Sequence, residues 1–207
     1  MNSKDLPEVN QSIKEKPVAE QPKHCNQGAA DAGRDPATPM ASPIPEHGSC
    51  FVCGTENKKG MGVVWCMQKT PISQDDVNPL TPFDKIRAVP GAVRVYAEFE
   101  FDEAQQGPPG HAHGGASAAV IDEAMGAVVW QSGLQALLAN LNLDYRLPVP
   151  LHTPLRAEAE LQKLEGRKAF ARGRILVGDR VAVEGTGLFV HIPTFFGDHN
   201  QFPGPSE

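Results

Sequence analysis

Apolar and polar residues alternate one by one along several stretches of the chain. Such alternation is typical of strands that bury one face and expose the other. It covers residues 93–102, 140–145, 155–162, 169–177 and 181–190, and a weaker strand is expected at 61–67. Gly178 and Asp179 are expected to form a tight turn between the last two strands. One apolar and one more polar face per strand predicts an antiparallel sheet that is covered on one side.

One segment departs from this alternation. Residues 114–131 are rich in alanine and apolar almost all round, which predicts a buried helix and not a surface helix. Two of the expected strands precede this helix and four follow it. The pattern therefore predicts an α+β fold, in which an antiparallel sheet of about six strands wraps around one long buried helix.

Polar segments flank the alternating region. Residues 1–46 contain seven prolines and few large apolar residues, so they cannot bury enough surface to offset their chain entropy. We therefore predict a disordered tail at 1–46, a folded domain at 47–193 and a second tail at 194–207. Within the domain, residues 68–90 form a long polar insertion, which we interpret as either a flap or a passive surface loop.

Composition narrows the class of protein. The net charge is −6 over 207 residues, which argues against a nucleic-acid binder with a strongly basic surface. No apolar run approaches the length of a membrane span. The first residues also lack the layout of a secretory signal, so we expect a soluble cytoplasmic protein.

The four cysteines, at positions 25, 50, 53 and 66, raise the question of a metal. Cys50 and Cys53 have the spacing of half a zinc site, but no second such pair follows. A complete site would need scattered ligands such as His47 and Cys66. We therefore predict no metal, and we interpret Cys50 and Cys53 as a packed thiol pair at the opening of the fold.

The start of the predicted helix carries the candidate chemistry. Gly114 and Gly115 let another group approach the free N–H groups of the first turn. Those N–H groups and the helix dipole favour an anion, including the oxyanion that develops in acyl transfer. Asp122, two turns further on, is a candidate general base or carboxylate nucleophile, with a structural ion pair as the alternative. Glu123 is expected to reach solvent or the rim of a pocket.

Two histidines precede the helix in the predicted loop, His111 and His113. They suggest a metal or base role. They are only two residues apart, however, and no acidic third ligand stands at a convincing spacing. We therefore interpret His113 as a residue that fixes the loop by hydrogen bonding.

Helix geometry constrains any joint action of Gly114 and Asp122. Eight positions separate the two residues, which is roughly 12 Å along a helix. One carbonyl group cannot contact both. If they act together, Asp122 must come from a second, antiparallel helix in a symmetric dimer, which predicts two equivalent sites at a subunit interface.

The helix start and several flanking motifs resemble a known family. His113, Gly114, Gly115 and Asp122, after Gly-Pro-Pro-Gly, look like the motif of hot-dog-fold acyl-CoA thioesterases of the phenylacetate-pathway (PaaI-like) group. Three further stretches are similar to the thioesterase superfamily member 4 branch or to bacterial hot-dog proteins, namely 139–151, 165–168 and the Cys-Phe-Val-Cys-Gly motif at 50–54. The resemblance runs from about residue 50 to 192. It implies a hot-dog fold and hydrolysis of acyl-CoA thioesters without a cofactor, coenzyme A being part of the substrate.

The resemblance also implies roles for single residues. Gly114 would donate its N–H to the thioester oxygen, with Gly115 and His113 beside it, while Asp122 of the other subunit would activate water or attack. Arg167 and Lys168 match a turn where the family contacts the phosphates of coenzyme A. They belong to a stretch, 144–174, that holds seven basic and four acidic residues.

One position departs from the family pattern. Family members often carry serine or threonine on the strand after the helix, where this chain has Leu138. A leucine can neither hold a water nor donate a hydrogen bond. Asn140 and Gln106 are the residues that we expect to compensate by contacting the substrate or the water.

Two alternative functions stay open. A hot-dog enoyl-thioester hydratase would use an Asp–His pair, whose spacing His111 and His113 do not reproduce well. A non-catalytic acyl-CoA-binding dimer is favoured by Leu138. In every case we expect a thioester of coenzyme A or of acyl carrier protein as ligand, a homodimer or a dimer of dimers, no nucleic acid and no membrane span.

Overall fold

The computed structural model describes residues 25, 41–69, 93–192, 194 and 195. Most of the two predicted tails, and residues 70–92 with most of the predicted insertion, lie outside these described residues. Cys25 forms a disulfide with Cys66. This bond joins a residue of the predicted N-terminal tail to the first residue of a strand.

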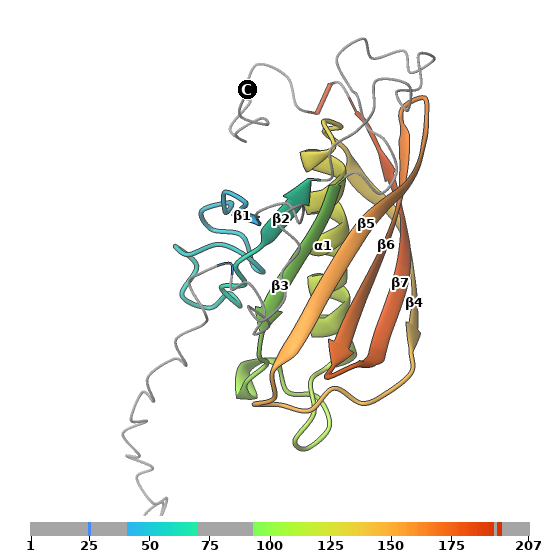
Figure 1. Cartoon of the computed structure of the whole chain (residues 1–207). Helices are drawn as coiled ribbons and strands as arrows, with labels where there is room; N and C mark the ends of the chain where they lie inside the picture. Colours follow the sequence, from blue (N-terminus) through green and yellow to red (C-terminus); the bar gives the residue numbers. More distant parts are fainter. Residues whose placement is uncertain (1–24, 26–40, 70–92, 193, 196–207) are drawn as a thin grey trace, which may run out of the picture.

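The strands form one antiparallel sheet that curves around a single long helix (Figure 1). The helix α1 spans Gly114–Gln131, and a short 3-10 helix spans Glu103–Gln105. The strands are β1 (Ser42–Pro43), β2 (Cys66–Lys69), β3 (Val93–Phe99), β4 (Leu137–Tyr145), β5 (Leu155–Glu165), β6 (Lys168–Val177) and β7 (Arg180–Val190). Their order across the sheet is β1-β2-β3-β5-β6-β7-β4, so β4 forms one edge. This arrangement is the predicted hot-dog fold.

The helix has the predicted bounds. The strands at the N-terminal side of the sheet differ from the prediction in two ways. The weak strand expected at 61–67 is found at Cys66–Lys69. Its expected first part bonds elsewhere, because the N–H groups of Met61 and Val63 donate to carbonyls of the turn around Cys50 and Cys53. In addition, β1 pairs with β2 although it falls inside the predicted tail, so the sheet begins before residue 47.

Glycines on the sheet let α1 lie close to it. Gly173 of β6 pairs with Gly185 of β7, directly under the helix. A Cβ atom added at Gly173 would lie 3.1 Å from Cγ2 of Ile121, and one at Gly187 would lie 2.9 Å from Cε of Met125. Both helix side chains are fully buried. The missing glycine side chains therefore create the space that Ile121 and Met125 fill.

The two sides of α1 differ in burial. The side that faces the sheet contributes seven buried residues, which are Ser117, Val120, Ile121, Ala124, Met125, Val128 and Val129. The opposite side carries small residues at helical spacing that stay partly or fully accessible in the single chain, namely Gly115, Ala119, Asp122 and Gly126. Within the described residues, no helix combines the length and the apolarity needed to span a bilayer.

Replacing Ile121 with alanine should lower the free energy of unfolding by about 2–5 kcal/mol. The side chain is 0% exposed and rests on strand glycines, which have no side chains that could move into the cavity. Ile121→Val is the matched control and should cost only about 0.5–1.5 kcal/mol. Urea unfolding followed by circular dichroism measures both changes. Equal losses for the two variants would contradict the close packing of α1 on the sheet.

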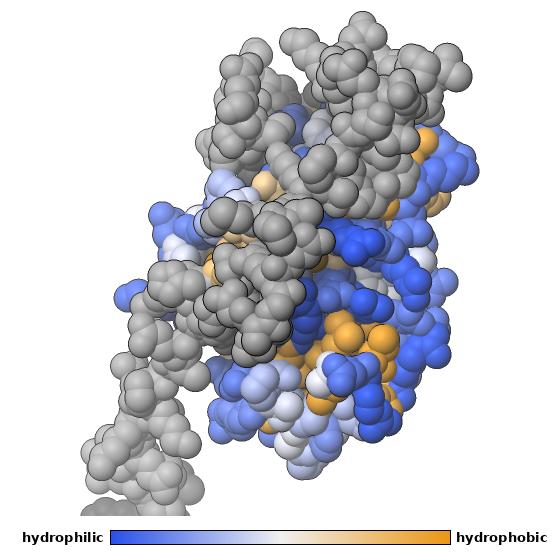
Figure 2. Space-filling model, viewed as in Figure 1, coloured by the Kyte–Doolittle hydropathy of each residue, from blue (hydrophilic) through white to orange (hydrophobic). Residues whose placement is uncertain are grey.

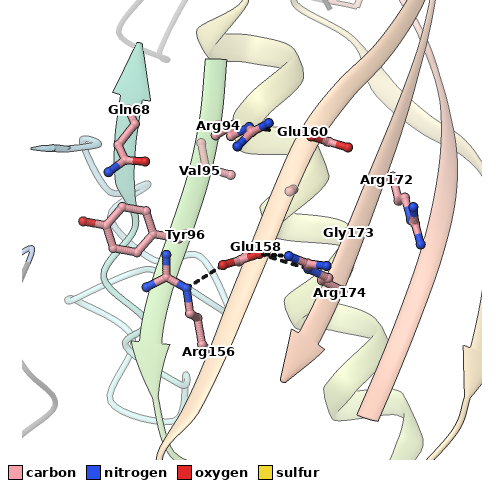
Figure 3. Close-up of a pocket in the computed structure, with 11 residues that line it drawn as sticks. Gln68, Arg94, Val95, Tyr96, Arg156, Glu158, Glu160, Arg172, Gly173 and Arg174 are labelled. Atoms are coloured by element: carbon pink, nitrogen blue, oxygen red, sulfur yellow. Dashed lines mark hydrogen bonds and ion pairs between the residues drawn. The ribbon is translucent and has the colours of Figure 1, made fainter. Parts of the chain in front are cut away.

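Ion pairs cover the outer face of the sheet. Figure 2 shows this face as largely hydrophilic, with one apolar patch low in the view. In the hollow drawn in Figure 3, Arg156 lies 2.6 Å from both Glu98 and Glu158 and 4.4 Å from the ring centre of Tyr96. Arg174 donates to the other carboxylate oxygen of Glu158 at 2.7 Å. The arginines that line the hollow are therefore paired with glutamates.

The basic stretch 144–174 is neutralised in the same way. Five of its seven cations form ion pairs with glutamates, and these are Arg146, Arg156, Lys163, Arg172 and Arg174. Arg167 and Lys168 have no ion pair among the residues that the structure describes. Of the positive charge that the sequence suggested for this stretch, the part without an ion pair to a described residue lies at the turn between β5 and β6.

Replacing Glu158 with glutamine should lower the free energy of unfolding at neutral pH by about 1 kcal/mol. Burial raises the pKa of this carboxyl, but the hydrogen bonds from Arg156 and Arg174 outweigh burial, so the net pKa lies below the usual value of 4.5. A lowered folded-state pKa gives stability that is present above pH 4.5 and is lost as the pH falls. Urea unfolding at neutral and acidic pH should therefore show a smaller difference between wild type and variant in acid, whereas a constant difference would contradict the charge pairing.

Candidate active site

The loop before α1 is folded back on itself and presents the helix start. The N–H of Gly107 donates to the carbonyl of His111, and the side chain of Gln106 accepts the N–H of Gly110 at 3.2 Å. A Cβ atom at Gly107 would lie 2.8 Å from Cα of His113, so this crossing requires glycine. Gln106 holds this loop together through its bond to Gly110, and its contact with coenzyme A or its compensation for Leu138 stays a prediction.

His113 is the N-cap of α1. Its Nδ1 accepts the N–H of Gly115 at 2.8 Å. The interpretation of His113 as a residue that fixes the loop is confirmed. The same bond uses the N–H of Gly115, which is therefore not available to a ligand in this conformation.

The N–H of Gly114 differs from that of Gly115. It meets no acceptor among the described residues, while its carbonyl accepts a hydrogen bond from the Tyr145 hydroxyl at 2.9 Å. The Tyr145 ring also lies 3.3 Å from where a Cβ atom of Gly114 would be. Tyr145 ends the edge strand β4, so this strand fixes the position of the first helical residue. The structure thus leaves one amide of the first turn open and oriented by the helix.

Asp122 lies in the middle of α1 and lines a cavity of about 860 Å³. The cavity is also lined by Glu123, Trp130 and Leu138. Burial raises the pKa of Asp122, and the charge of the neighbouring Glu123 raises it further. A carboxylate with a raised pKa is a better proton acceptor than an ordinary aspartate, which suits a general base. Asp122 has no ion pair with a residue that the structure describes.

Glu123 faces a cluster of side chains and is only partly accessible to solvent. Its carboxylate accepts a hydrogen bond from the Cys53 thiol at 3.0 Å, and it lies 3.5 Å from Nδ1 of His47. Cys50 donates to its other oxygen at 3.7 Å. Burial alone would raise the pKa of Glu123, but the hydrogen bonds from His47 and Cys53 outweigh burial and lower it. Glu123 was expected to reach solvent or the rim of a pocket, and its place in the lining of the cavity agrees with the second of these.

Contact with the Glu123 carboxylate shifts the pKa values of its partners His47 and Cys53. The hydrogen bond to Glu123 raises the pKa of His47, although burial opposes it. Burial raises the pKa of the Cys53 thiol strongly, and the carboxylate charge adds to this effect. Cys66, named with His47 as a scattered ligand, is bound to Cys25 and is not part of this cluster.

The remaining predicted site residues lie away from Gly114 in the single chain. Arg167 and Lys168 occupy the β5–β6 turn, where the Arg167 carbonyl accepts the N–H of His191. His191 also contacts the carbonyl of Gln135, just after the C-terminal end of α1. These cations therefore lie at the opposite end of the helix from Gly114 (Figure 1). Asn140 is exposed on β4, outside the cavity lined by Asp122.

Sequence reasoning missed two contacts of this site. The Tyr145 hydroxyl at Gly114 follows from the register of β4 against the helix, which no local pattern encodes. The meeting of Glu123 with Cys50 and Cys53 joins residues about 70 positions apart. The spacing of the two cysteines was visible, but nothing in the sequence placed them beside α1.

Comparisons with known proteins agree with this geometry. Residues 109–184 match the model of the thioesterase superfamily. Acyl-coenzyme A thioesterase THEM4 of Rattus norvegicus is 37% identical over 101 residues, covering 48% of this chain and 44% of that protein. The Mus musculus protein of the same name is 40% identical over 89 residues, covering 42% and 38%. A solved thioesterase superfamily protein, RHA08564, is 30% identical with a TM-score of 0.56, covering 69% of this chain and 60% of that one.

The matched segment contains α1 and most of the sheet, so the part of the chain that carries the candidate site is similar to the thioesterase superfamily. Within that superfamily, the chain is similar to the acyl-coenzyme A thioesterases named THEM4. It spans less than half the length of these curated relatives.

Proposed function

We propose that this chain hydrolyses acyl-CoA thioesters to the free acid and coenzyme A. The observation that carries the proposal is the Gly114 N–H, an amide at the positive end of α1 that has no acceptor among the described residues. Its position suits the oxygen of a thioester carbonyl, which gains negative charge when the carbonyl is attacked. The similarity to acyl-coenzyme A thioesterases supports the same substrate class.

The reaction needs a donor and a base. Water attacks the carbonyl carbon while Asp122 accepts its proton, the Gly114 N–H binds the oxyanion, and the C–S bond breaks to release the coenzyme A thiolate, which takes up a proton. In the nucleophilic variant, the Asp122 carboxylate attacks first and displaces the coenzyme A thiolate, which takes up a proton, and water then opens the resulting anhydride to the free acid and the regenerated carboxylate. Neither route needs a cofactor beyond the coenzyme A of the substrate.

Two copies of the chain would complete each site. About 12 Å of helix separates Gly114 from Asp122, so a single chain cannot apply both to one carbonyl. The accessible small residues on one side of α1 would let a second helix approach closely, and Asp122 lies on that side. The edge strand β4, whose side chains are all partly or fully accessible, lies beside it. These features favour a homodimer with antiparallel helices.

The same arrangement gives Arg167 and Lys168 a role. In an antiparallel pair, the C-terminal end of one α1 lies on the same side as the N-terminal end of the other. The partner's β5–β6 turn would then bring two cations, which have no ion pair with a described residue, toward the substrate at Gly114. We propose that they bind the phosphates of coenzyme A. A cytoplasmic location and a role in lipid metabolism stay predictions.

A panel of short, long and aromatic acyl-CoA thioesters tests the proposal, with free coenzyme A measured by chromatography. We expect release of coenzyme A from at least one class of substrate, and turnover of the matching acyl carrier protein thioester would identify that carrier as the substrate. Hydration of crotonyl-CoA without hydrolysis would replace the proposal by a hydratase.

A second candidate function rests on Leu138. This side chain lines the cavity of Asp122 and offers no hydroxyl to hold a water. A dimer that binds acyl-CoA without cleaving it is the function that this observation favours. Calorimetry with a non-hydrolysable acyl-CoA thioether distinguishes the two candidates: binding with no release of coenzyme A in the panel would favour the non-catalytic dimer.

A further inference from the structure

Four side chains of types that can bind a metal meet at the wall of the cavity that Asp122 also lines. They are His47, Cys50, Cys53 and Glu123, and one potential ligand atom of each lies within 4.8 Å of the others. We call them the thiol–carboxylate cluster. We propose that the thiol–carboxylate cluster is a zinc site closed by four protein ligands. Support for this site does not rest on the proposed hydrolysis.

The distances within the cluster fit a tetrahedral ion. Zinc bonds of about 2.0–2.3 Å place neighbouring ligand atoms roughly 3.3–3.8 Å apart. Cys53 Sγ lies 3.7 Å from His47 Nδ1, and His47 Nδ1 lies 3.5 Å from Oε1 of Glu123. Cys50 Sγ lies 3.7 Å from Oε2 of Glu123, and the 3.0 Å between Cys53 and Glu123 is somewhat shorter. Small side-chain rotations therefore suffice to surround an ion.

The donor set favours zinc over other metals. Two sulfurs, one imidazole nitrogen and one carboxylate oxygen are all ligand types that zinc accepts in four-coordinate sites. Magnesium and calcium prefer oxygen ligands and higher coordination numbers. The four donors would satisfy a tetrahedral ion without water, which is the pattern of a structural site.

The backbone turn at residues 50–54 holds the two cysteine thiols in a fixed arrangement. The Val52 N–H points to Cys50 Sγ at 3.4 Å, a contact that stabilises a thiolate. The Gly54 N–H donates to the Cys50 carbonyl at 3.1 Å. A Cβ atom at Gly54 would lie 2.4 Å from both the Cys50 nitrogen and the Gly48 oxygen, so only glycine fits there. The turn thus holds both thiols toward Glu123.

A metal here would fasten the N-terminal segment to the helix. His47, Cys50 and Cys53 belong to the chain between β1 and β2, whereas Glu123 belongs to α1. The prediction of no metal relied on the absence of a second cysteine pair, and the fold supplies the fourth donor from a distant helix. Bound zinc would stabilise the folded chain by an amount that grows with its free concentration.

Cobalt titration of the full chain tests the proposal, because tetrahedral Co²⁺ reports its ligands by absorbance. The reduced protein is stripped with a chelator and titrated with Co²⁺, then with Zn²⁺. We expect one Co²⁺ per chain, a thiolate-to-cobalt charge-transfer band, the strong d–d bands of a tetrahedral ion, and loss of all bands when one equivalent of Zn²⁺ is added.

Variants distinguish the thiol–carboxylate cluster from adventitious binding. Cys53→Ser and Glu123→Gln should each bind at least about 100-fold more weakly, since losing a direct ligand costs more than losing an outer partner. The double variant Cys25→Ser/Cys66→Ser is the matched control and should bind as the wild type does. If Cys53→Ser does not fold, the cobalt spectrum of the wild type and the metal affinity of Glu123→Gln test the zinc site.

Three results would overturn the zinc site. The first is a cobalt spectrum without a thiolate band. The second is wild-type affinity in Glu123→Gln or in a folded Cys53→Ser. The third is a disulfide between Cys50 and Cys53 in the native protein, detected by mass spectrometry of peptides.

Discussion

Replacing Asp122 with asparagine is expected to abolish most acyl-CoA hydrolysis while the protein stays folded. A positioned general base contributes about 10²–10⁴-fold to a rate, and the amide of asparagine cannot accept a proton from water. The loss should appear in kcat, measured on the best substrate of the acyl-CoA panel. Unchanged turnover would remove this carboxylate from the mechanism.

Stability provides the control for this variant. Because burial raises the pKa of Asp122, its charged form is unfavourable in the folded protein at neutral pH. Asparagine removes that charge, so the melting temperature of Asp122→Asn should equal or exceed that of the wild type. In the wild type, kcat/KM should fall in acid at a pH above the usual aspartate pKa of 3.8, because the base works only when ionised. A destabilised variant would indicate a structural role for Asp122.

Replacing Gly114 with proline should lower kcat by about 10²–10³-fold, the usual cost of losing one oxyanion donor. Proline removes the N–H but suits the first position of a helix. The preceding residue, His113, has φ −67° and ψ 138°, which is the extended conformation that a following proline prefers. The substitution therefore deletes the donor and leaves the helix in place.

Gly114→Ala is the matched control for the proline variant. Alanine adds the same crowding against the Tyr145 ring, where a Cβ atom lies 3.3 Å from Cε1, but it keeps the N–H. Its kcat should stay within a few-fold of the wild type, and circular dichroism should report the same helix content for both variants. Equal activities of the proline and alanine variants would show that this amide does not bind the oxyanion.

The local elements of this fold could be predicted because their patterns are strong. The helix was predicted at 114–131 from its run of small apolar residues and was found with the same bounds. Four strands on its C-terminal side alternate clearly, and the structure has them at β4 to β7. The weak strand at 61–67 was misplaced because its backbone bonds to the Cys50–Cys53 turn, a long-range effect without a local signature.

The candidate site could be predicted only in part, for the same reason. Gly114 and Asp122 stand out because glycines at a helix start and a carboxylate inside an apolar helix are unusual in themselves. The partners of Glu123 were missed because His47 and Cys53 come from a segment that the sequence does not place against α1. The bond of Gln106 to Gly110 was missed because it depends on how the loop folds back.

Tyr145 is the last residue of β4, and its hydroxyl donates a hydrogen bond to the carbonyl of Gly114 in the first turn of α1. A slip of β4 by one residue against β7 would reverse the face on which each of its side chains lies. The hydroxyl would then leave the Gly114 carbonyl, and the opening amide of the helix would lose its anchor. The correct register of the edge strand β4 is therefore required for the Gly114 amide to be held in place.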